Sequence, residues 1–281
     1  MTQERAVTRK PSITIKPSPR WVPLNLAEVW EYRSLLVFLA WRDVSVRYKQ
    51  TALGVAWAVI QPLLTMIVFS VFFGRLIRVP SDGVPYPVFS YAALLPWQYF
   101  STALASASQS LITDEKLVTK IYFPRLIIPL ASIIPPVVDF GAAFVILIGL
   151  MIFYGIPVTG RLLLLPVLMV LAATAALGLG LWLSATNVRY RDFRYVVPFV
   201  IQFWLFVSPV AYPSSVVPEQ WRLIFGLNPM TGVIEGFRWA LLSTDTAPGP
   251  LILVSALISL LTLVSGAYYF RNMERSFSDI I

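Results

Sequence analysis

Charged side chains crowd together immediately before the first long apolar stretch of the chain. The residues are Arg42, Asp43, Arg47 and Lys49, and the next charged residue is Arg75. The planar guanidinium group of arginine pairs well with phosphate oxygens. The cationic members of this cluster are therefore candidates for binding a phosphate group at the point where an apolar helix begins.

One carboxylate, Asp139, lies inside an apolar stretch. It follows Pro135 and Pro136, which bend a helix and free backbone carbonyl groups. An ionisable residue inside a membrane span is a functional candidate by default. Asp139 is either structural, being protonated or hydrogen-bonded to freed carbonyls and a nearby hydroxyl, or part of a proton relay. A relay usually needs further titratable groups, and the other apolar stretches carry none deep inside, which disfavours it.

The composition excludes several classes of protein. The chain has no histidine and no cysteine, so it lacks the commonest general base, the commonest metal ligand and any disulfide. Of its 281 residues, 57% are hydrophobic and 13% are charged. Soluble domains have about 45–50% apolar and about 25% charged residues. The chain is therefore predicted to be an all-α integral membrane protein, with no catalytic, metal or cofactor-binding residues assigned.

Long uncharged runs predict the membrane-spanning helices that must position these charged residues. A helix needs about 20 apolar residues to cross the hydrocarbon core. The runs predict a transmembrane domain over 51–281 with six spans. The predicted boundaries are 53–76, 88–111, 127–153, 162–186, 195–211 and 250–270.

Small residues at a spacing of four predict close helix packing in two of these spans. In the fourth span the residues are Ala172, Ala176 and Gly180, and the second span contains Ala103 and Ala107. Small side chains let helices approach closely in a membrane.

The distribution of the basic residues predicts the orientation. Most of the 22 Lys and Arg residues fall on the side that holds both termini. The positive-inside rule places this side, and with it both termini, in the cytoplasm. The net charge of +8 thus reports topology, and nucleic acid is not an expected partner. The exceptions on the outer side are Arg75, Arg78, Arg161, Arg222 and Arg238.

Two segments precede the first span. Residues 1–24 are basic and proline-rich and are predicted to form a flexible cytoplasmic tail. Residues 25–50 are predicted to form an amphipathic helix at the cytoplasmic interface and its connector, with Asn25 as the cap and Glu28 three residues further on. This helix either only anchors the first span or offers a surface to a soluble partner.

The outer segment before the last span, about 212–249, is predicted to be re-entrant. Within it, residues 223–234 are uncharged but too few to cross a membrane. Asn228-Pro229 and Gly232 are predicted to break this stretch into two short helices.

Four stretches together give a family resemblance. The chain resembles the permease subunit of type-2 ABC exporters of bacterial polysaccharides, the O-antigen, capsule and teichoic acid group. The matching stretches, which occur in the family's order, are RDVSVRYKQTALGVAWAVIQP (42–62), KLVTKIYFPRLIIPL (116–130), NVRYRDFRY (187–195) and LNPMTGVIEGFRWALL (227–242).

The resemblance implies a homodimer in the bacterial inner membrane, surrounded by membrane lipids and docked on two copies of a separate cytoplasmic ATPase. ATP and Mg would belong to that partner, since the sequence contains no G-x-x-x-x-G-K-[ST] phosphate-binding loop. The chain itself would be a permease subunit and not an enzyme. The expected substrate is a polysaccharide linked to a polyprenyl diphosphate.

The resemblance also assigns roles to residues. Arg42, Arg47 and Lys49 would contact the lipid diphosphate. Spans one and five would line the channel, with flat aromatic side chains along the glycan path at Phe69, Phe72, Phe73, Phe199, Phe203, Trp204 and Tyr212. The residues expected to dock the ATPase are Glu28, Glu31, Arg33, Glu115, Lys116, Lys120 and Tyr122.

Two alternative functions remain open. The first is the permease of a related ABC exporter for a drug or lipid, which differs in its substrate. The second is a membrane-embedded enzyme acting on lipid-linked sugars, which would need clustered carboxylates or a metal site. Asp82 and Asp245 on the outer side lack evident partners in the sequence.

Overall fold

The structure, a computed structural model, describes residues 24, 26–49, 54–242, 247 and 249–280. Over these residues the chain consists of helices joined by turns and loops, which agrees with the all-α prediction. The helices are α1 (Leu26–Glu31), α2 (Arg33–Lys49), α3 (Gly54–Phe69), η1 (Ser70–Leu76), α4 (Tyr86–Thr113), α5 (Glu115–Lys120), α6 (Ile127–Ser132), α7 (Pro135–Phe153), η2 (Gly160–Leu164), α8 (Leu165–Arg189), α9 (Phe193–Val207), η3 (Ser214–Val216), α10 (Glu219–Phe225), α11 (Pro229–Leu242) and α12 (Pro250–Ile280).

Four helical stretches in the described part of the chain are long and apolar enough to cross a membrane. They are Ala56–Leu76, Ile127–Phe153, Gly160–Arg189 and Pro250–Arg275. Helix α4 is long enough, with 28 residues, but its serines and glutamines make it more polar. Helix α9 is apolar but has only 15 residues. These two are the second and fifth of the six predicted spans.

The structure corrects three predicted boundaries, and proline explains two of them. The fifth predicted span stops at Val207 and not at residue 211, because Ser208 precedes Pro209 and is extended. The third is divided between α6 and α7, because Pro135 is better placed at the start of a helix than inside one. The last helix, α12, continues about ten residues beyond the predicted end, to Ile280.

Helix α8 lies at the centre of the bundle and packs along its length against α4 and α12. The predicted small-residue faces are buried here, and Gly180 of α8 lies directly against Ala107 of α4. On the other side of α8, Gly178 and Gly266 bring its backbone into contact with that of α12. A side-chain carbon added at Gly178 would lie 2.5 Å from the backbone nitrogen of Leu263.

The N-terminal segment forms two helices, α1 and α2, and not a single one. Helix α2 packs on α6 and α7, and Leu39 and Ala40 are buried in a second hydrophobic cluster with α6 and the end of α12. Trp30, Val37 and Trp41 remain exposed. The predicted cap Asn25 and nearly all of the predicted tail 1–24 lie outside the described residues.

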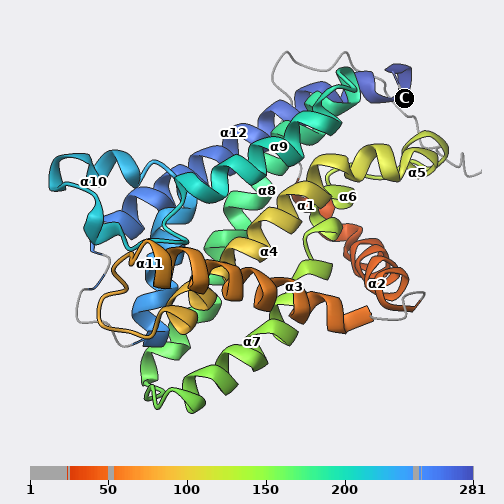
Figure 1. The fold of residues 1–281 in the computed structure, drawn as a ribbon. Coiled ribbons are helices and arrows are strands. Elements are labelled where there is room, and N and C mark those ends of the chain that lie inside the picture. Colours follow the sequence, from red (N-terminus) through yellow and green to blue (C-terminus); the bar gives the residue numbers. More distant parts are fainter. Residues whose placement is uncertain (1–23, 25, 50–53, 243–246, 248, 281) are drawn as a thin grey trace, which may run out of the picture.

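Two short helices, α10 and α11, lie in the segment 212–249 that is predicted to be re-entrant. They separate at Asn228, whose side chain accepts a hydrogen bond from the backbone N–H of Met230 at 3.0 Å. The predicted break at Gly232 is wrong, because Gly232 lies inside α11 and brings it against the backbone of α12 near Ile252. Helix α12 contacts α10 and α11 near its start and α5 near its end, and Figure 1 shows α10 and α5 at opposite ends of the bundle.

We predict that Gly178→Ala destabilises the fold by about 1–3 kcal/mol, because the added methyl group overpacks the contact between α8 and α12. The matched control is Gly149→Ala on α7, where an added carbon meets no atom within 4 Å. That change should be neutral or stabilising by up to about 1 kcal/mol through helix propensity. Thermal unfolding of both variants in detergent measures the difference, and equal midpoints would contradict the assigned packing.

Candidate functional site

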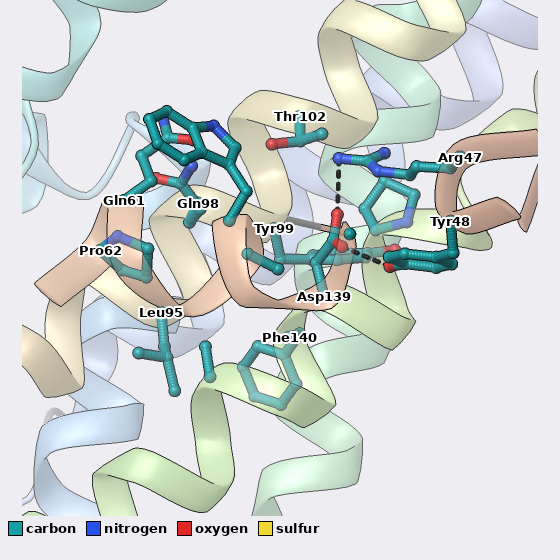
Figure 2. A pocket seen from close by; sticks show the side chains of 15 residues that line it. Arg47, Tyr48, Gln61, Pro62, Leu95, Gln98, Tyr99, Thr102, Asp139 and Phe140 are labelled. Carbon is teal, nitrogen blue, oxygen red and sulfur yellow. Dashed lines mark hydrogen bonds and ion pairs between the residues drawn. The ribbon is translucent and has the colours of Figure 1, made fainter. Parts of the chain in front are cut away.

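The half-buried carboxylate Asp139 joins α7 to the end of α2. Its Oδ2 atom lies 2.6 Å from the guanidinium of Arg47, and its Oδ1 atom accepts a hydrogen bond from the hydroxyl of Tyr48. Figure 2 shows both side chains reaching the carboxylate from the same helix. Only 14% of the Asp139 side chain is exposed. A hydroxyl partner was expected, whereas the pairing with Arg47 was not.

Tyr48 remains a donor in this arrangement. Burial raises the pKa of the Tyr48 phenol above its ordinary value, and the hydrogen bond to Asp139 raises it further. The phenol therefore keeps its proton at neutral pH. Asp139 consequently has a cation on one oxygen and a neutral donor on the other, which is the satisfied environment that a carboxylate inside a bundle requires.

A pocket of about 500 Å³ opens beside this carboxylate, between the end of α2 and the helices α3, α4 and α7. Arg47, Tyr48 and Asp139 line one part of it, and Figure 2 shows Gln61, Gln98 and Thr102 around the remainder. Its volume lies within the range of about 300–1,000 Å³ that is usual for small-molecule sites.

A second hollow, of about 590 Å³, adjoins the first, and Arg47 lines both. Its other charged residues are Arg42, Asp43 and Asp114. The guanidinium of Arg42 lies 2.8 Å from each of the two carboxylates, and the hydrogen bond to Asp114 raises the pKa of Arg42. This pairing ties α2 to the junction between α4 and α5.

The residues predicted to bind a lipid diphosphate thus differ in their surroundings. Arg42 and Arg47 are paired with carboxylates of the chain itself, and Lys49 is exposed. A phosphate that approached either arginine would have to share its donors with an aspartate. The assignment of the three residues to a diphosphate stays a prediction.

The residues predicted to dock an ATPase form two groups. Glu28 lies 3.5 Å from Arg271 of α12, which also pairs with Glu274. Arg125 donates to the backbone carbonyl of Glu274, and a hollow lined by these residues also contains Tyr122, which is 85% exposed. The remaining predicted residues are all exposed, namely Glu31, Arg33, Glu115, Lys116 and Lys120.

The predicted channel aromatics also divide by exposure. Phe69 packs edge-on against Phe73, and Trp204 packs edge-on against Phe100. Tyr212 donates its hydroxyl proton to the carbonyl of Phe206. The exposed members of the set are Phe72, Phe199 and Phe203. Helices α3 and α9, which carry most of these rings, both pack against α4.

A buried ion pair in α11 was not anticipated from the sequence. The guanidinium of Arg238 lies 3.1 Å from Glu235 and 3.7 Å from the centre of the Phe89 ring. It also donates to the carbonyls of Val210 and Tyr212, while Glu235 accepts from the backbone N–H of Ser214. The pair therefore holds the loop after α9 against α4.

A sequence signal for this pair exists. Glu235 and Arg238 stand three residues apart within an otherwise uncharged stretch, and such a spacing puts both on one helix face. In the predicted topology, Arg238 counts only as one of the charges on the outer side. Because its side chain is 3% exposed, it belongs to the core of the subunit.

Several apolar helices of membrane length, packed around a central helix and carrying charge clusters beyond their ends, define a multi-pass membrane protein. The chain belongs to the ABC-2 type transporter family, which matches residues 34–242 and so most of its length.

Two of its relatives carry the name O-antigen export system permease protein RfbA. The one from Myxococcus xanthus is 27% identical over 90% of this chain and 98% of that protein. The one from Klebsiella pneumoniae is 26% identical, covering 88% and 95% respectively. The polysialic acid transport protein KpsM of Escherichia coli is 22% identical over 84% of this chain and 92% of that protein.

We predict that Asp139→Asn lowers the stability of the fold by about 1–2 kcal/mol. This loss lies between those expected on breaking an exposed ion pair and on breaking a buried one. The amide retains a hydrogen-bond acceptor for Tyr48 but loses the attraction to Arg47. The matched control is Glu219→Gln, because Glu219 is 90% exposed and lies 3.8 Å from its partner. Thermal unfolding in detergent checks both, and an unchanged midpoint for Asp139→Asn would contradict the role of the pair.

Removing one member of the buried ion pair in α11 should lower the stability of the fold more than Asp139→Asn does. We predict that Glu235→Leu destabilises the fold by about 3–5 kcal/mol, because it leaves the Arg238 charge buried without its acid. The double variant with Arg238→Met should recover part of this loss, since it removes the stranded charge. A double variant that is less stable than Glu235→Leu alone would show that the arginine matters through its carbonyl contacts and not through the pair.

Proposed function

We propose that the chain is the membrane subunit of an ATP-driven exporter that moves a lipid-linked polysaccharide from the cytoplasm across the bacterial inner membrane. The observation that carries this proposal is the near full-length match to relatives that are named for O-antigen export and polysialic acid transport. Because the matches cover 92–98% of those proteins, the whole subunit is compared and not a shared segment.

The proposal includes six spans, with α4 and α9 crossing alongside the four more apolar stretches. The polar residues of α4 are compatible with a membrane, because much of this helix is buried among its neighbours. Both termini lie in the cytoplasm, and α10 and α11 form a re-entrant outer segment. Their 7 and 14 residues are too few to cross.

Two copies of the chain would form the channel, with the exposed rings of Phe72, Phe199 and Phe203 facing it. Flat aromatic surfaces suit a polymer that must slide, because their contacts are weakly specific. Rings that pack inside the subunit, such as Phe69 and Trp204, would instead hold the channel-forming helices on α4.

Energy would come from two copies of a separate ABC ATPase, which bind ATP and Mg. The exposed charges of α1, α2 and α5 and the exposed ring of Tyr122 offer a surface for it. Closure of the ATPases would push α2, whose ion pairs with Asp114 and Asp139 pass the displacement to α4 and α7. Export of a drug or lipid is the second candidate, because the aromatic rings of Trp57 and Phe140 in the pocket beside Asp139 would also suit an apolar substrate.

The test is co-purification from the native host through a tag on this chain. We expect an equimolar soluble ATPase, and we expect Tyr122→Ala combined with Lys120→Glu to weaken its association at least about tenfold, as for an interface anchor. Both residues are exposed, so thermal stability should not change. Trp221→Ala is the matched control, because Trp221 is an exposed aromatic on α10 at the other end of the bundle.

Deletion of the gene tests the substrate. Loss of surface polysaccharide, with accumulation of the lipid-linked form inside the cell, is the expected result. A cell surface that keeps its polysaccharide, or a purified complex that contains no ATPase, would overturn the proposal.

A further inference from the structure

The pocket beside Asp139 contains polar groups that the subunit itself does not use. Among the described residues, the side chains of Gln61, Gln98, Tyr99 and Thr102 have no hydrogen-bond partner. Each of them lines the pocket, from α3 on one side and from α4 on the other. Polar side chains within membrane-spanning helices are costly unless they meet a partner, so four at one site indicate a polar ligand.

Aromatic rings line the same pocket. Trp57 of α3 is 54% exposed, and Tyr99 and Phe140 contribute from α4 and α7. A wall that combines flat rings with amides and hydroxyls fits a sugar, whose ring has apolar C–H faces and a rim of hydroxyl groups. A purely apolar lipid chain would leave the amides of Gln61 and Gln98 without partners.

The charged part of the pocket fits the group next to that sugar. Arg47 lines both the pocket and the adjoining hollow, so its guanidinium stands where the two spaces meet. Arginine has five N–H donors, so it can keep its contact with Asp139 while binding phosphate oxygens. An anionic group at Arg47 would lie within reach of a sugar held by Gln98 and Trp57.

We propose that this pocket binds the sugar nearest the diphosphate of a lipid-linked glycan, with Trp57, Gln61, Gln98 and Thr102 on the sugar and Arg47 on the diphosphate. The inference rests on the proposed function and deepens it. The chain would then select its substrate at the lipid-proximal end of the glycan, where the growing polymer and the lipid meet. The rest of the polymer would not need to be recognised by this pocket.

The experiment measures lipid binding to the full chain in complex with its ATPase, in nanodiscs. Three probes are compared by native mass spectrometry: a polyprenyl diphosphate with one N-acetylhexosamine, the same diphosphate without sugar, and phosphatidylglycerol. Gln98→Leu and Trp57→Ala should each weaken binding of the sugar-bearing probe about tenfold, as expected for lost hydrogen bonding or ring contact. Binding of the sugar-free diphosphate should stay unchanged in both. Arg47→Gln should weaken binding of both diphosphates.

Two matched controls lie outside the pocket. Gln220→Leu and Trp221→Ala change the same residue types on α10, where both side chains are exposed. Neither should alter binding of any probe. Gln98→Leu removes an amide that has no partner within the subunit, so this variant should fold normally. Its loss of binding would therefore not reflect a loss of stability.

Three outcomes separate the inference from the proposed function. If the pocket variants bind the sugar-bearing probe as tightly as the natural sequence, the inference is overturned. If they weaken all three probes equally, the pocket is a general lipid site and the inference is again overturned. In both cases, loss of surface polysaccharide on gene deletion would leave the proposed function standing. Unchanged surface polysaccharide would remove the proposed function itself.

Discussion

Helices inside a membrane cannot rely on the hydrophobic effect to hold them together, because lipid tails are as apolar as their own side chains. In this chain, α8 is held instead by close packing against its two neighbours, α4 and α12. Gly178 and Gly266 bring the backbones of α8 and α12 together, and Gly180 meets Ala107 of α4. Further helices are arranged around these three, since α7, α9 and α11 all pack on α4 or α8.

Paired charges complete the arrangement at the ends of this framework. Arg238 and Glu235 fix the loop after α9 on one side, whereas Arg42 and Arg47 tie α2 to α4 and α7 on the other. Glu28, Arg271 and Glu274 join α1 to the end of α12. Each cluster links segments that are distant in sequence, so local helix propensity does not determine their positions. Ion pairs of this kind are weak evidence for stability but specific evidence for geometry.

The sequence allowed the helices to be predicted well and their partners poorly. Uncharged runs are a local property, so the continuous stretch of α3 and η1, as well as α4 and α8, is predicted to within a few residues. The early end of α9 also has a local cause, because Ser208 precedes Pro209 and is extended. Pairing of Asp139 with Arg47 spans 92 positions, and no spacing rule connects residues so far apart. Gly232 illustrates a further limit, because a glycine reads equally as a helix break or as a site of close contact until its neighbour is known.

The attachment of α2 to Asp139 has a mechanical consequence. A helix held by one bond can pivot about that bond, so it passes on a push but not a twist. Arg47 and Tyr48 are consecutive residues, and they hold the two different oxygens of a single carboxylate. Since two points define a direction, α2 cannot turn about its axis without pulling on α7. The joint therefore transmits torque as well as displacement, and a rotation imposed on α2 would reach α7 as a rotation.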